Sequence, residues 1–213
     1  MTADLFPDAR RHMVLDEGAV LLGGFAETQG GALLDAIAQI AVDAPFRHLE
    51  TPGGKRMSVA MTNCGPLGWV SDRRGYRYEP RDPLSGKAWP AMPPLFQSLA
   101  LEAAEAAGYA GFRPDACLIN RYAPGSRLTL HQDRDEGHYD WPIVSVSLGV
   151  PAVFLWGGPA RSDRTKRVGL AHGDVVVWGG ASRLNFHGIA DLKETQHPLT
   201  GALRYNLTFR QAR

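Results

Sequence analysis

The sequence has few cysteines, no long apolar run and almost no net charge. Cys64 and Cys117 belong to no CxxC pair, which excludes a disulfide framework and favours reduced thiols in a cytoplasmic protein. We expect neither a membrane span nor a secretory signal, because no stretch of about 18 apolar residues occurs and no basic region precedes an apolar one near residue 1. The 23 Lys+Arg and 22 Asp+Glu leave a net charge of +1, so total charge does not indicate a polyanionic partner.

The remaining composition is typical of a globular protein, with 213 residues of which 44% are hydrophobic and 21% charged. A chain of this length buries enough apolar surface to fold without disulfides. The sequence contains no internal repeat, low-complexity tract or linker that would divide it. We therefore expect a single domain over residues 1–213.

The hydrophobic patterns predict helices first and strands second. Apolar residues at helical spacing predict a helix over 29–43, and a Pro-Pro start with a glycine stop predicts another from Pro93 to Gly108. Residues 49–90 are typical of loops and short hairpins. From Asp115 onward, short runs of Val, Ile, Leu and Phe between turns predict an α+β fold whose β core is a sandwich or barrel. The predicted strands are 116–122, 126–132, 143–150, 152–156, 174–178, 183–189 and 203–210.

One predicted strand carries a possible metal site. Residues i and i+2 of a strand face the same way, so His131 and Asp133 bring an imidazole and a carboxylate to one point. A second imidazole from a later strand would complete a facial triad. Two histidines and one carboxylate with open coordination positions are typical of non-haem Fe(II) oxygen chemistry.

The His-x-Asp pattern alone is weak evidence, because about 0.5 such pairs arise by chance in this composition. A second match, His172-Gly173-Asp174, is interpreted as a turn that enters the apolar run 175–178. A structural role for His131 is the alternative.

The run 204–210 adds independent support. Strand alternation places Arg204, Asn206, Thr208 and Arg210 on one face and Tyr205, Leu207 and Phe209 on the other. Two inward guanidinium groups would be costly without an anion, and a dicarboxylate would satisfy both. An exposed polar face is the alternative. In the predicted strand 116–122, Leu118, Asn120 and Tyr122 share a face, and the last two would donate to the same anion.

Together these residues resemble the AlkB family of Fe(II)/2-oxoglutarate dioxygenases, over about residues 15–211. The resemblance implies a double-stranded β-helix, or jelly roll, with Fe(II), 2-oxoglutarate and O2 at one open end. It implies iron ligation by His131, Asp133 and His187, rather than by His172 or His197. It also implies 2-oxoglutarate binding by Arg204 and Arg210, with Asn120, Tyr122 and Asn206 assisting and Leu118, Ser145 and Phe154 lining the pocket. The motifs that carry it are Met57–Gly65, Pro114–Gly125, His131-Gln132-Asp133, Asn185–Ile189 and Arg204–Arg210.

The resemblance also divides the domain into a nucleotide-recognition lid, about 45–90, and a jelly-roll catalytic core, about 114–213. Trp69 matches the residue that stacks on the extruded base opposite His131. Tyr76 and Tyr78 match substrate contacts, and Asp135 and Arg161 match residues that border the pocket. From the residues alone, Trp69 could equally be core and Arg161 a solvated charge. Lys55 departs from the pattern, since an aromatic residue stands there in a family member.

The implied activity is oxidative demethylation of 1-methyladenine and 3-methylcytosine in DNA, with release of formaldehyde, as direct repair of alkylation damage. We expect a monomer that acts on single-stranded DNA, with duplex DNA or RNA as further substrates. Two alternatives stay open: the same chemistry on methylated RNA or another substrate, and a non-catalytic jelly roll that binds nucleic acid. The candidate phosphate contacts are Arg73, Arg74, Arg77 and Arg81 in the lid, and Arg161, Arg164, Lys166 and Arg167 in a later loop.

Overall fold

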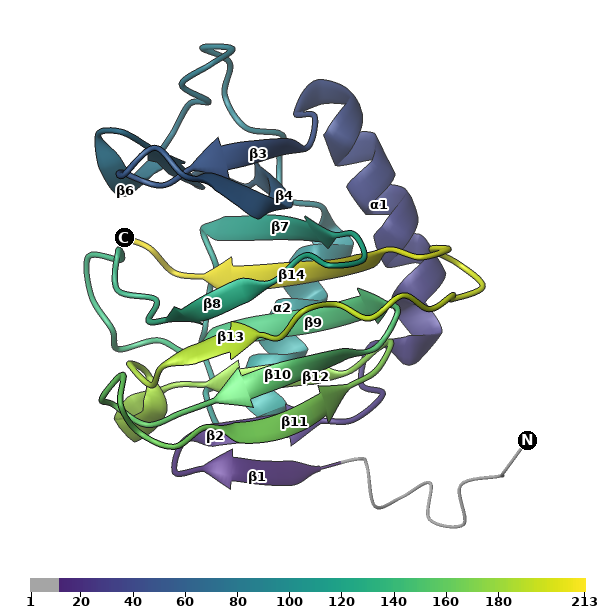
Figure 1. Cartoon of the computed structure of the whole chain (residues 1–213), viewed down its shortest axis with the longest axis vertical. Helices are drawn as coiled ribbons and strands as arrows, with labels where there is room; N and C mark the ends of the chain where they lie inside the picture. Colours follow the sequence, from purple (N-terminus) through teal and green to yellow (C-terminus); the bar gives the residue numbers. More distant parts are fainter. Residues whose placement is uncertain (1–11) are drawn as a thin grey trace.

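The polypeptide forms two antiparallel sheets that face each other, with both helices behind the larger one (Figure 1). The computed structural model describes residues 12–213. A separate hairpin, formed by β5 and β6, lies beyond the β3 edge of the large sheet, which is the edge opposite β1. No helix of the described residues is long and apolar enough to cross a membrane.

The strands alternate between the sheets as they do in a jelly roll. The eight-stranded sheet has the order β1 (Met13–Asp16), β2 (Ala19–Leu22), β12 (Val175–Trp178), β9 (Ile143–Gly149), β14 (Arg204–Arg210), β7 (Ala116–Tyr122), β4 (Arg56–Cys64) and β3 (Arg47–Glu50). The four-stranded sheet has the order β11 (Lys166–Leu170), β10 (Ala152–Trp156), β13 (His187–Ile189) and β8 (Leu128–His131). The third sheet pairs β5 (Gly68–Asp72) with β6 (Gly75–Glu79).

The two predicted helices are present as α1 (Gly30–Asp43) and α2 (Pro94–Ala106), alongside short 3-10 turns at Glu27–Gln29 and Gly180–Ser182. The proline start of α2 is as predicted, and Gly108, at φ +89°, allows the chain to turn away. Both helices bury their apolar faces against the outer face of the large sheet. That core includes Leu33, Ile37, Phe96, Leu99 and Ala103.

The predicted alternation along β14 is confirmed. Leu207 and Phe209 pack in the core under the helices, whereas Arg204, Asn206, Thr208 and Arg210 face the space between the sheets. A second core, which includes Phe154, Trp156, Val176 and Trp178, fills the remainder of that space. Because both faces of β14 are covered, its polar residues are buried and need partners inside the protein.

Several strands differ from the prediction at their ends or were not expected. β13 covers only 187–189, because residues 180–186 form a 3-10 turn and an irregular segment instead of a strand. The strands β1, β2 and β11 were not predicted. β11 alternates exposed Lys166, Arg167 and Gly169 with buried Val168 and Leu170, a pattern too short to recognise among basic residues.

Candidate active site

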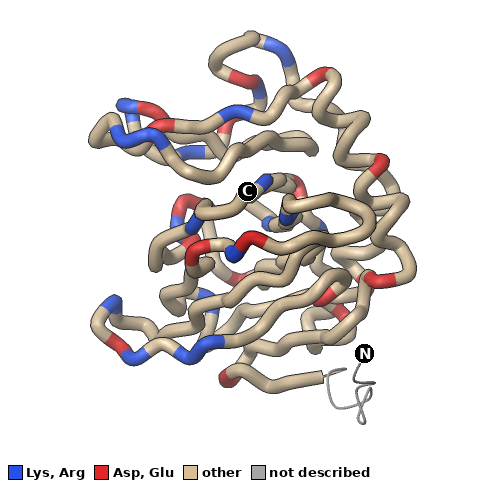
Figure 2. Tube along the Cα trace, turned by 45° about the vertical axis from the view of Figure 1, so that its right-hand side comes forward, with Lys and Arg blue, Asp and Glu red and all other residues tan. Residues whose placement is uncertain are grey.

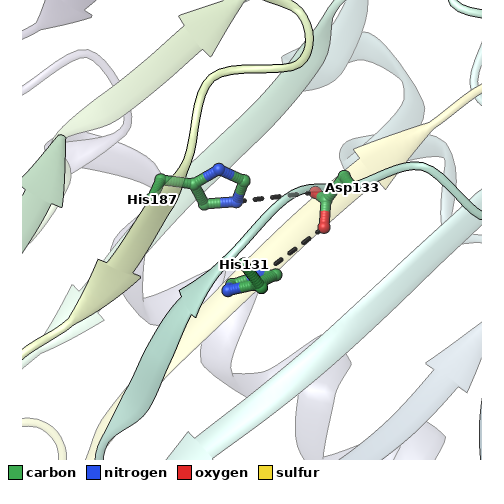
Figure 3. Close-up of side chains that lie close together, drawn as sticks. All are labelled: His131, Asp133 and His187. Carbon is green, nitrogen blue, oxygen red and sulfur yellow. Dashed lines mark ion pairs between the residues drawn. The ribbon is translucent and has the colours of Figure 1, made fainter. Parts of the chain in front are cut away.

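Three side chains from the open end of the small sheet meet at one point (Figure 3). β8 ends at His131 and β13 begins at His187, and these two residues are register partners with ring centroids 4.4 Å apart. Asp133 follows β8, with its Oδ1 3.5 Å from His131 Nε2 and its Oδ2 3.8 Å from His187 Nε2. All three ligand atoms lie within 4.8 Å of one another. The geometry therefore fits a facial His-Asp-His metal site.

The protonation states also suit a metal. The Nδ1–H of His131 donates to the Thr129 carbonyl at 2.9 Å, and that of His187 donates to the Asn185 carbonyl at 3.0 Å, which leaves each Nε2 free to ligate. Burial lowers the pKa of His187 to about 4, so this imidazole is neutral. Burial alone would raise the pKa of Asp133, but the charges of Arg210 and the histidines hold it well below its ordinary value. The donor set is thus two imidazoles, each with its Nε2 free to ligate, and one carboxylate.

Arg204 is a buried cation with unused hydrogen-bonding capacity. It is 1% exposed, its Nη2 donates to Ser147 Oγ at 2.9 Å, and its guanidinium lies 5.0 Å from the ring centroid of Tyr122. Its Nε and Nη1 have no hydrogen-bond partner among the described residues. Burial lowers the pKa of Arg204. An unpaired guanidinium at this depth fits a carboxylate ligand, which would take both remaining donors.

Amide groups lie next to this guanidinium because β7, β14 and β9 are adjacent. Asn206 is the register partner of Asn120, and the Asn120 amide donates to Asn206 Oδ1 at 3.3 Å. Asn206 itself donates to Ser145 Oγ at 2.8 Å, and Thr208 Oγ1 donates to Asn206 Oδ1 at 2.9 Å. These hydrogen bonds fix the orientation of the polar side chains along this wall of the cavity before any ligand binds.

Arg210, at the far end of β14, is paired with the metal site. Its Nη2 and Nε donate to Asp133 Oδ2 at 2.6 and 3.1 Å, and its Nε lies 3.3 Å from Glu136 Oε1. These carboxylates outweigh the effect of burial and raise the pKa of Arg210 above its ordinary value. Arg210 therefore connects the His-Asp-His cluster to the polar side chains of β14.

A single cavity of about 770 Å³ joins these groups. The expected metal ligands and expected 2-oxoglutarate residues all line it, as do Leu118, Ser145 and Phe154. Its wall also includes Trp69, Tyr76, Asp135 and Arg161 from the expected substrate contacts. The residues present thus fit iron with a bound dicarboxylate, and they leave space for a larger substrate.

The substrate side of the cavity is aromatic and acidic. Trp69 and Tyr76 stack with ring centroids 5.6 Å apart and an interplanar angle of 13°. The Trp69 indole N–H donates to Asp135 Oδ2 at 2.8 Å. Burial raises the pKa of Asp135, and the nearby carboxylates of Glu136 and Asp133 act in the same direction, against the hydrogen bond from Trp69. An aromatic wall beside a carboxylate favours a flat, cationic group.

Tyr78 differs from the expectation of a substrate contact. It does not line the cavity, and its hydroxyl donates to Glu136 Oε1 at 2.7 Å. Tyr76, Tyr78 and Trp69 share one face of the hairpin, because residues i and i+2 and register partners point the same way. Tyr78 differs in its position along that face, where it packs against Leu67, Ala116 and Ala212. Tyr78 thus attaches the hairpin to the core.

The second His-x-Asp match forms the predicted turn. Gly173 has φ +83°, and the Asp174 carboxylate accepts the N–H groups of Gly24 and Ala171. His172 Nδ1 accepts from the Gly149 N–H, and its ring stacks on His197 with centroids 4.5 Å apart. Neither histidine belongs to the metal cluster.

Two charged residues of the site had no recognisable signal in the sequence. Glu136 has a side chain that is 1% exposed and lies between Arg210 and Arg183, whose Nη2 is 3.2 Å from Glu136 Oε2. Arg183 also donates to the Asp133 carbonyl at 2.7 Å. Both stand in irregular segments, where no strand or helix period predicts which way a side chain points.

Basic residues gather on two segments that contribute residues to the cavity wall. Figure 2 shows Lys and Arg along the β5–β6 hairpin and along the loop between β10 and β11, both at the left of the view. Two expected phosphate contacts are already engaged: Arg77 pairs with Asp72 and Glu79 at 2.9 and 2.7 Å, and Lys166 donates to the Leu15 carbonyl at 2.8 Å. Lys55, Arg56, Arg127 and Arg161 line the cavity itself.

Comparison with known proteins agrees with this geometry. Residues 18–210 match the 2OG-Fe(II) oxygenase superfamily. The chain is 61% identical over 210 residues to the alpha-ketoglutarate-dependent dioxygenase AlkB of Salmonella typhimurium and 59% identical to that of Escherichia coli, covering 98% of this chain and 97% of each relative.

The chain belongs to the AlkB dioxygenases of the 2OG-Fe(II) oxygenase superfamily.

Its fold and co-substrates follow from this membership. The solved structure of OsALKBH1 superposes with a TM-score of 0.83 at 31% identity, covering 94% of this chain and 99% of that one, and the jelly-roll prediction is confirmed. Fe(II), 2-oxoglutarate and O2 are the cofactor and co-substrates, as expected. More distant AlkB relatives are a DNA N(6)-methyladenine demethylase of Arabidopsis thaliana, 33% identical over 171 residues, and a tRNA demethylase of Schizosaccharomyces pombe, 32% identical over 100 residues.

Proposed function

We propose that the protein removes methyl groups by oxidation from 1-methyladenine and 3-methylcytosine in DNA. The observation that carries the proposal is that one cavity joins the His-Asp-His cluster, the unpaired Arg204 and the Trp69–Asp135 wall. The first two fit iron and 2-oxoglutarate, and the third fits a cationic base. The names of the distant relatives, which are DNA and tRNA demethylases, support a nucleic-acid substrate.

His131, Asp133 and His187 would hold the iron, and Arg204 and Arg210 the two ends of 2-oxoglutarate. Bound iron, with O2 and 2-oxoglutarate, supplies the oxidant that hydroxylates a methyl C–H bond, while 2-oxoglutarate becomes succinate and carbon dioxide. Asn120, Tyr122 and Asn206 form the wall beside Arg204 and orient the dicarboxylate. The residues of this chain thus contribute position and exclusion of water.

The product of hydroxylation is a hemiaminal on the ring nitrogen. Its O–H proton leaves and its C–N bond breaks, so formaldehyde departs and the ring nitrogen recovers its electron pair. The adenine or cytosine is then restored without cutting the strand. This reaction is direct repair of alkylation damage.

The charge of the damaged base provides the selectivity. Adenine methylated at N1 and cytosine methylated at N3 are cationic near neutral pH, and the face of Trp69 would attract them by about 1–2 kcal/mol. Asp135, which now accepts the Trp69 N–H, would accept from the exocyclic amine. A methylated Watson–Crick edge has already lost its pairing, so extrusion costs less at the damaged site.

The setting of this activity is also proposed. We expect a cytoplasmic monomer that prefers single-stranded DNA, because no pairing energy opposes entry of a single-stranded base into the cavity. The residues 56–64 belong to the large sheet, so the moving part of the lid would be the β5–β6 hairpin with the loops that flank it.

The decisive experiment supplies iron-loaded protein with 2-oxoglutarate, O2 and oligonucleotides that carry 1-methyladenine or 3-methylcytosine. Mass spectrometry should show loss of 14 Da per damaged base, about one methylene, with stoichiometric formaldehyde and succinate. Parallel reactions on single-stranded DNA, duplex DNA and RNA rank the substrates. The folded variant His131→Ala should bind iron poorly and release no formaldehyde. The absence of formaldehyde with the wild-type protein would refute the proposal.

A further inference from the structure

One carboxylate holds the chain segment that follows β14. Asp115 Oδ1 accepts the Ala212 N–H at 2.7 Å, and Asp115 Oδ2 accepts the Arg213 N–H at 3.1 Å. The Asp115 N–H donates to the Arg210 carbonyl at 3.0 Å. Asp115 therefore fixes the main chain at Arg210 and beyond it.

A second connection runs from the same segment to the guanidinium of Arg210. The Ala212 carbonyl accepts the Gly137 N–H at 3.0 Å, and Gly137 follows Glu136, whose Oε1 is 3.3 Å from Arg210 Nε. A displacement of Ala212 would thus disturb Arg210 at its main chain and at its charged end. Ala212 is only 3% exposed, so it has little freedom to move while Asp115 is present.

Asp115 does not line the cavity, and its effect on any ligand must pass through other residues. Arg210 does line the cavity and also donates to the metal ligand Asp133. A shift of about 1 Å in such a charged group costs up to about 100-fold in binding or rate, because hydrogen bonds to a carboxylate depend steeply on distance.

We propose that Asp115 is a positioning residue for 2-oxoglutarate: it holds the main chain at the Arg210 carbonyl and at Ala212 and Arg213, and so aims the Arg210 guanidinium at the co-substrate. The proposal rests on the proposed role of Arg210 in binding 2-oxoglutarate. The Asp115 side chain is the active part. Its backbone carbonyl, which accepts the Leu67 N–H at 3.1 Å at the base of the β5–β6 hairpin, remains in any side-chain variant.

The test compares Asp115→Ala, which removes both acceptors, with Asp115→Asn, which retains one. Calorimetric titration of 2-oxoglutarate into manganese(II)-loaded protein measures Kd without turnover. We expect Kd to rise about 10-fold in Asp115→Ala and about 3-fold in Asp115→Asn. In assays of the iron enzyme, KM for 2-oxoglutarate should follow Kd. Both kcat at saturating 2-oxoglutarate and KM for the methylated oligonucleotide should stay within about twofold.

Asp82→Asn is the matched control. The Asp82 carboxylate, like that of Asp115, accepts a backbone N–H, that of Leu84, and lies outside the cavity lining; Asp82 is buried, whereas Asp115 is half-buried. This variant should lose stability and keep the wild-type Kd for 2-oxoglutarate. If Asp115→Ala does not fold, Asp115→Asn carries the test, with its expected rise of about 3-fold in Kd.

Two outcomes overturn the proposal: a folded Asp115→Ala with Kd within twofold of the wild type, or an equal rise in Asp82→Asn. The proposed function fails in a different way. A wild-type protein that binds 2-oxoglutarate but releases no formaldehyde from methylated oligonucleotides refutes the demethylase activity and leaves the role of Asp115 intact.

Discussion

Arg204 shows how a single residue can be costly in the free protein and useful in the complex. Its guanidinium is buried with two donor atoms that have no partner among the described residues, and burial lowers its pKa. A desolvated, incompletely paired cation costs several kcal/mol. The incompletely paired guanidinium therefore destabilises the ligand-free protein, and a bound carboxylate would relieve this destabilisation.

The variant Arg204→Met should stabilise the protein in the absence of 2-oxoglutarate. Methionine fills a similar volume without a charge, so the free energy of unfolding should rise by about 1–2 kcal/mol. Added 2-oxoglutarate should then no longer raise Tm. Thermal unfolding with and without 2-oxoglutarate measures both effects.

Arg210→Met is the informative contrast, because Arg210 is paired. Its loss leaves the buried Asp133 carboxylate without its closest cation, and Tm should fall. Equal destabilisation by the two substitutions would contradict the interpretation of Arg204 as an unsatisfied charge.

At the residue scale, the sequence predicted some residues of the site and not others. His131 and Asp133 were predicted from strand alternation, and Arg204 and Arg210 from the cost of inward charges. His187 required the family resemblance, because three later histidines fitted the spacing equally well. Glu136 and Arg183 were not found at all, since their positions depend on how two irregular segments fold over β14.

At the element scale, the β5–β6 hairpin carries Trp69 and Tyr76, the proposed substrate contacts that line the cavity. Trp69→Phe keeps an aromatic ring but loses the hydrogen bond to Asp135 and part of the cation–π attraction. We expect KM for a methylated oligonucleotide to rise about fivefold, equivalent to about 1 kcal/mol, with KM for 2-oxoglutarate unchanged. Steady-state kinetics with each substrate varied in turn provide the measurement.

Tyr78→Phe serves as the control on the same hairpin. It removes one hydrogen bond, to Glu136, from a side chain that does not line the cavity. KM for the oligonucleotide should stay within about twofold. A larger rise than in Trp69→Phe would return Tyr78 to the set of substrate contacts.

The loop that follows this hairpin is held by Asp82, and its stability should depend on pH. Burial alone would raise the pKa of Asp82, but hydrogen bonds from Arg47, the Leu84 N–H and Ser85 outweigh it and lower the pKa to about 2. A carboxyl with a depressed pKa contributes stability above its unfolded pKa and loses it as pH falls toward the folded value. The contribution is about 1 kcal/mol, because Arg47 is partly exposed and water screens the pair.

Asp82→Asn should therefore lower the free energy of unfolding by about 1 kcal/mol at pH 7 and by much less near pH 2, where the folded carboxyl is about half protonated. Urea unfolding of both proteins between about pH 2 and pH 7 tests this. A difference that persists unchanged at pH 2 would show that Asp82 contributes through packing instead of charge.

The helices and strands were predicted best where apolar residues repeat with one period over several helical turns or over a full strand. Both helices and the strands β7, β9, β10 and β14 agree closely with the prediction. Short edge strands such as β1 and β11 were missed, because four or five residues with one exposed face carry too little pattern. Tertiary pairing, which no local window contains, decides them.

At the scale of the whole molecule, the charged residues are distributed unevenly over the surface. A net charge of +1 hides basic segments on the β5–β6 hairpin and the β10–β11 loop. We expect affinity for a single-stranded oligonucleotide to fall as the salt concentration rises. The slope of log affinity against log salt should be proportional to the number of phosphates contacted. Arg161→Ala, at the cavity wall, should reduce the slope of log Kd against log salt by about 0.7.

Arg77→Ala provides the comparison, because Arg77 is already neutralised by Asp72 and Glu79. Its effect on the slope should be smaller than that of Arg161→Ala. Fluorescence anisotropy at several salt concentrations distinguishes the two. Identical slopes for the wild type and Arg161→Ala would exclude a phosphate contact at that position.

The alternation along β14 has a consequence for how the gene tolerates change. Leu207 and Phe209 belong to the helix-covered core, whereas Arg204, Asn206 and Arg210 line the cavity. In a saturation-mutagenesis library scored separately for protein abundance and for survival under methylating agents, the two sets should separate with a period of two. Substitutions at the odd-numbered positions should lower both abundance and survival. Substitutions at the even-numbered positions should lower survival far more than abundance.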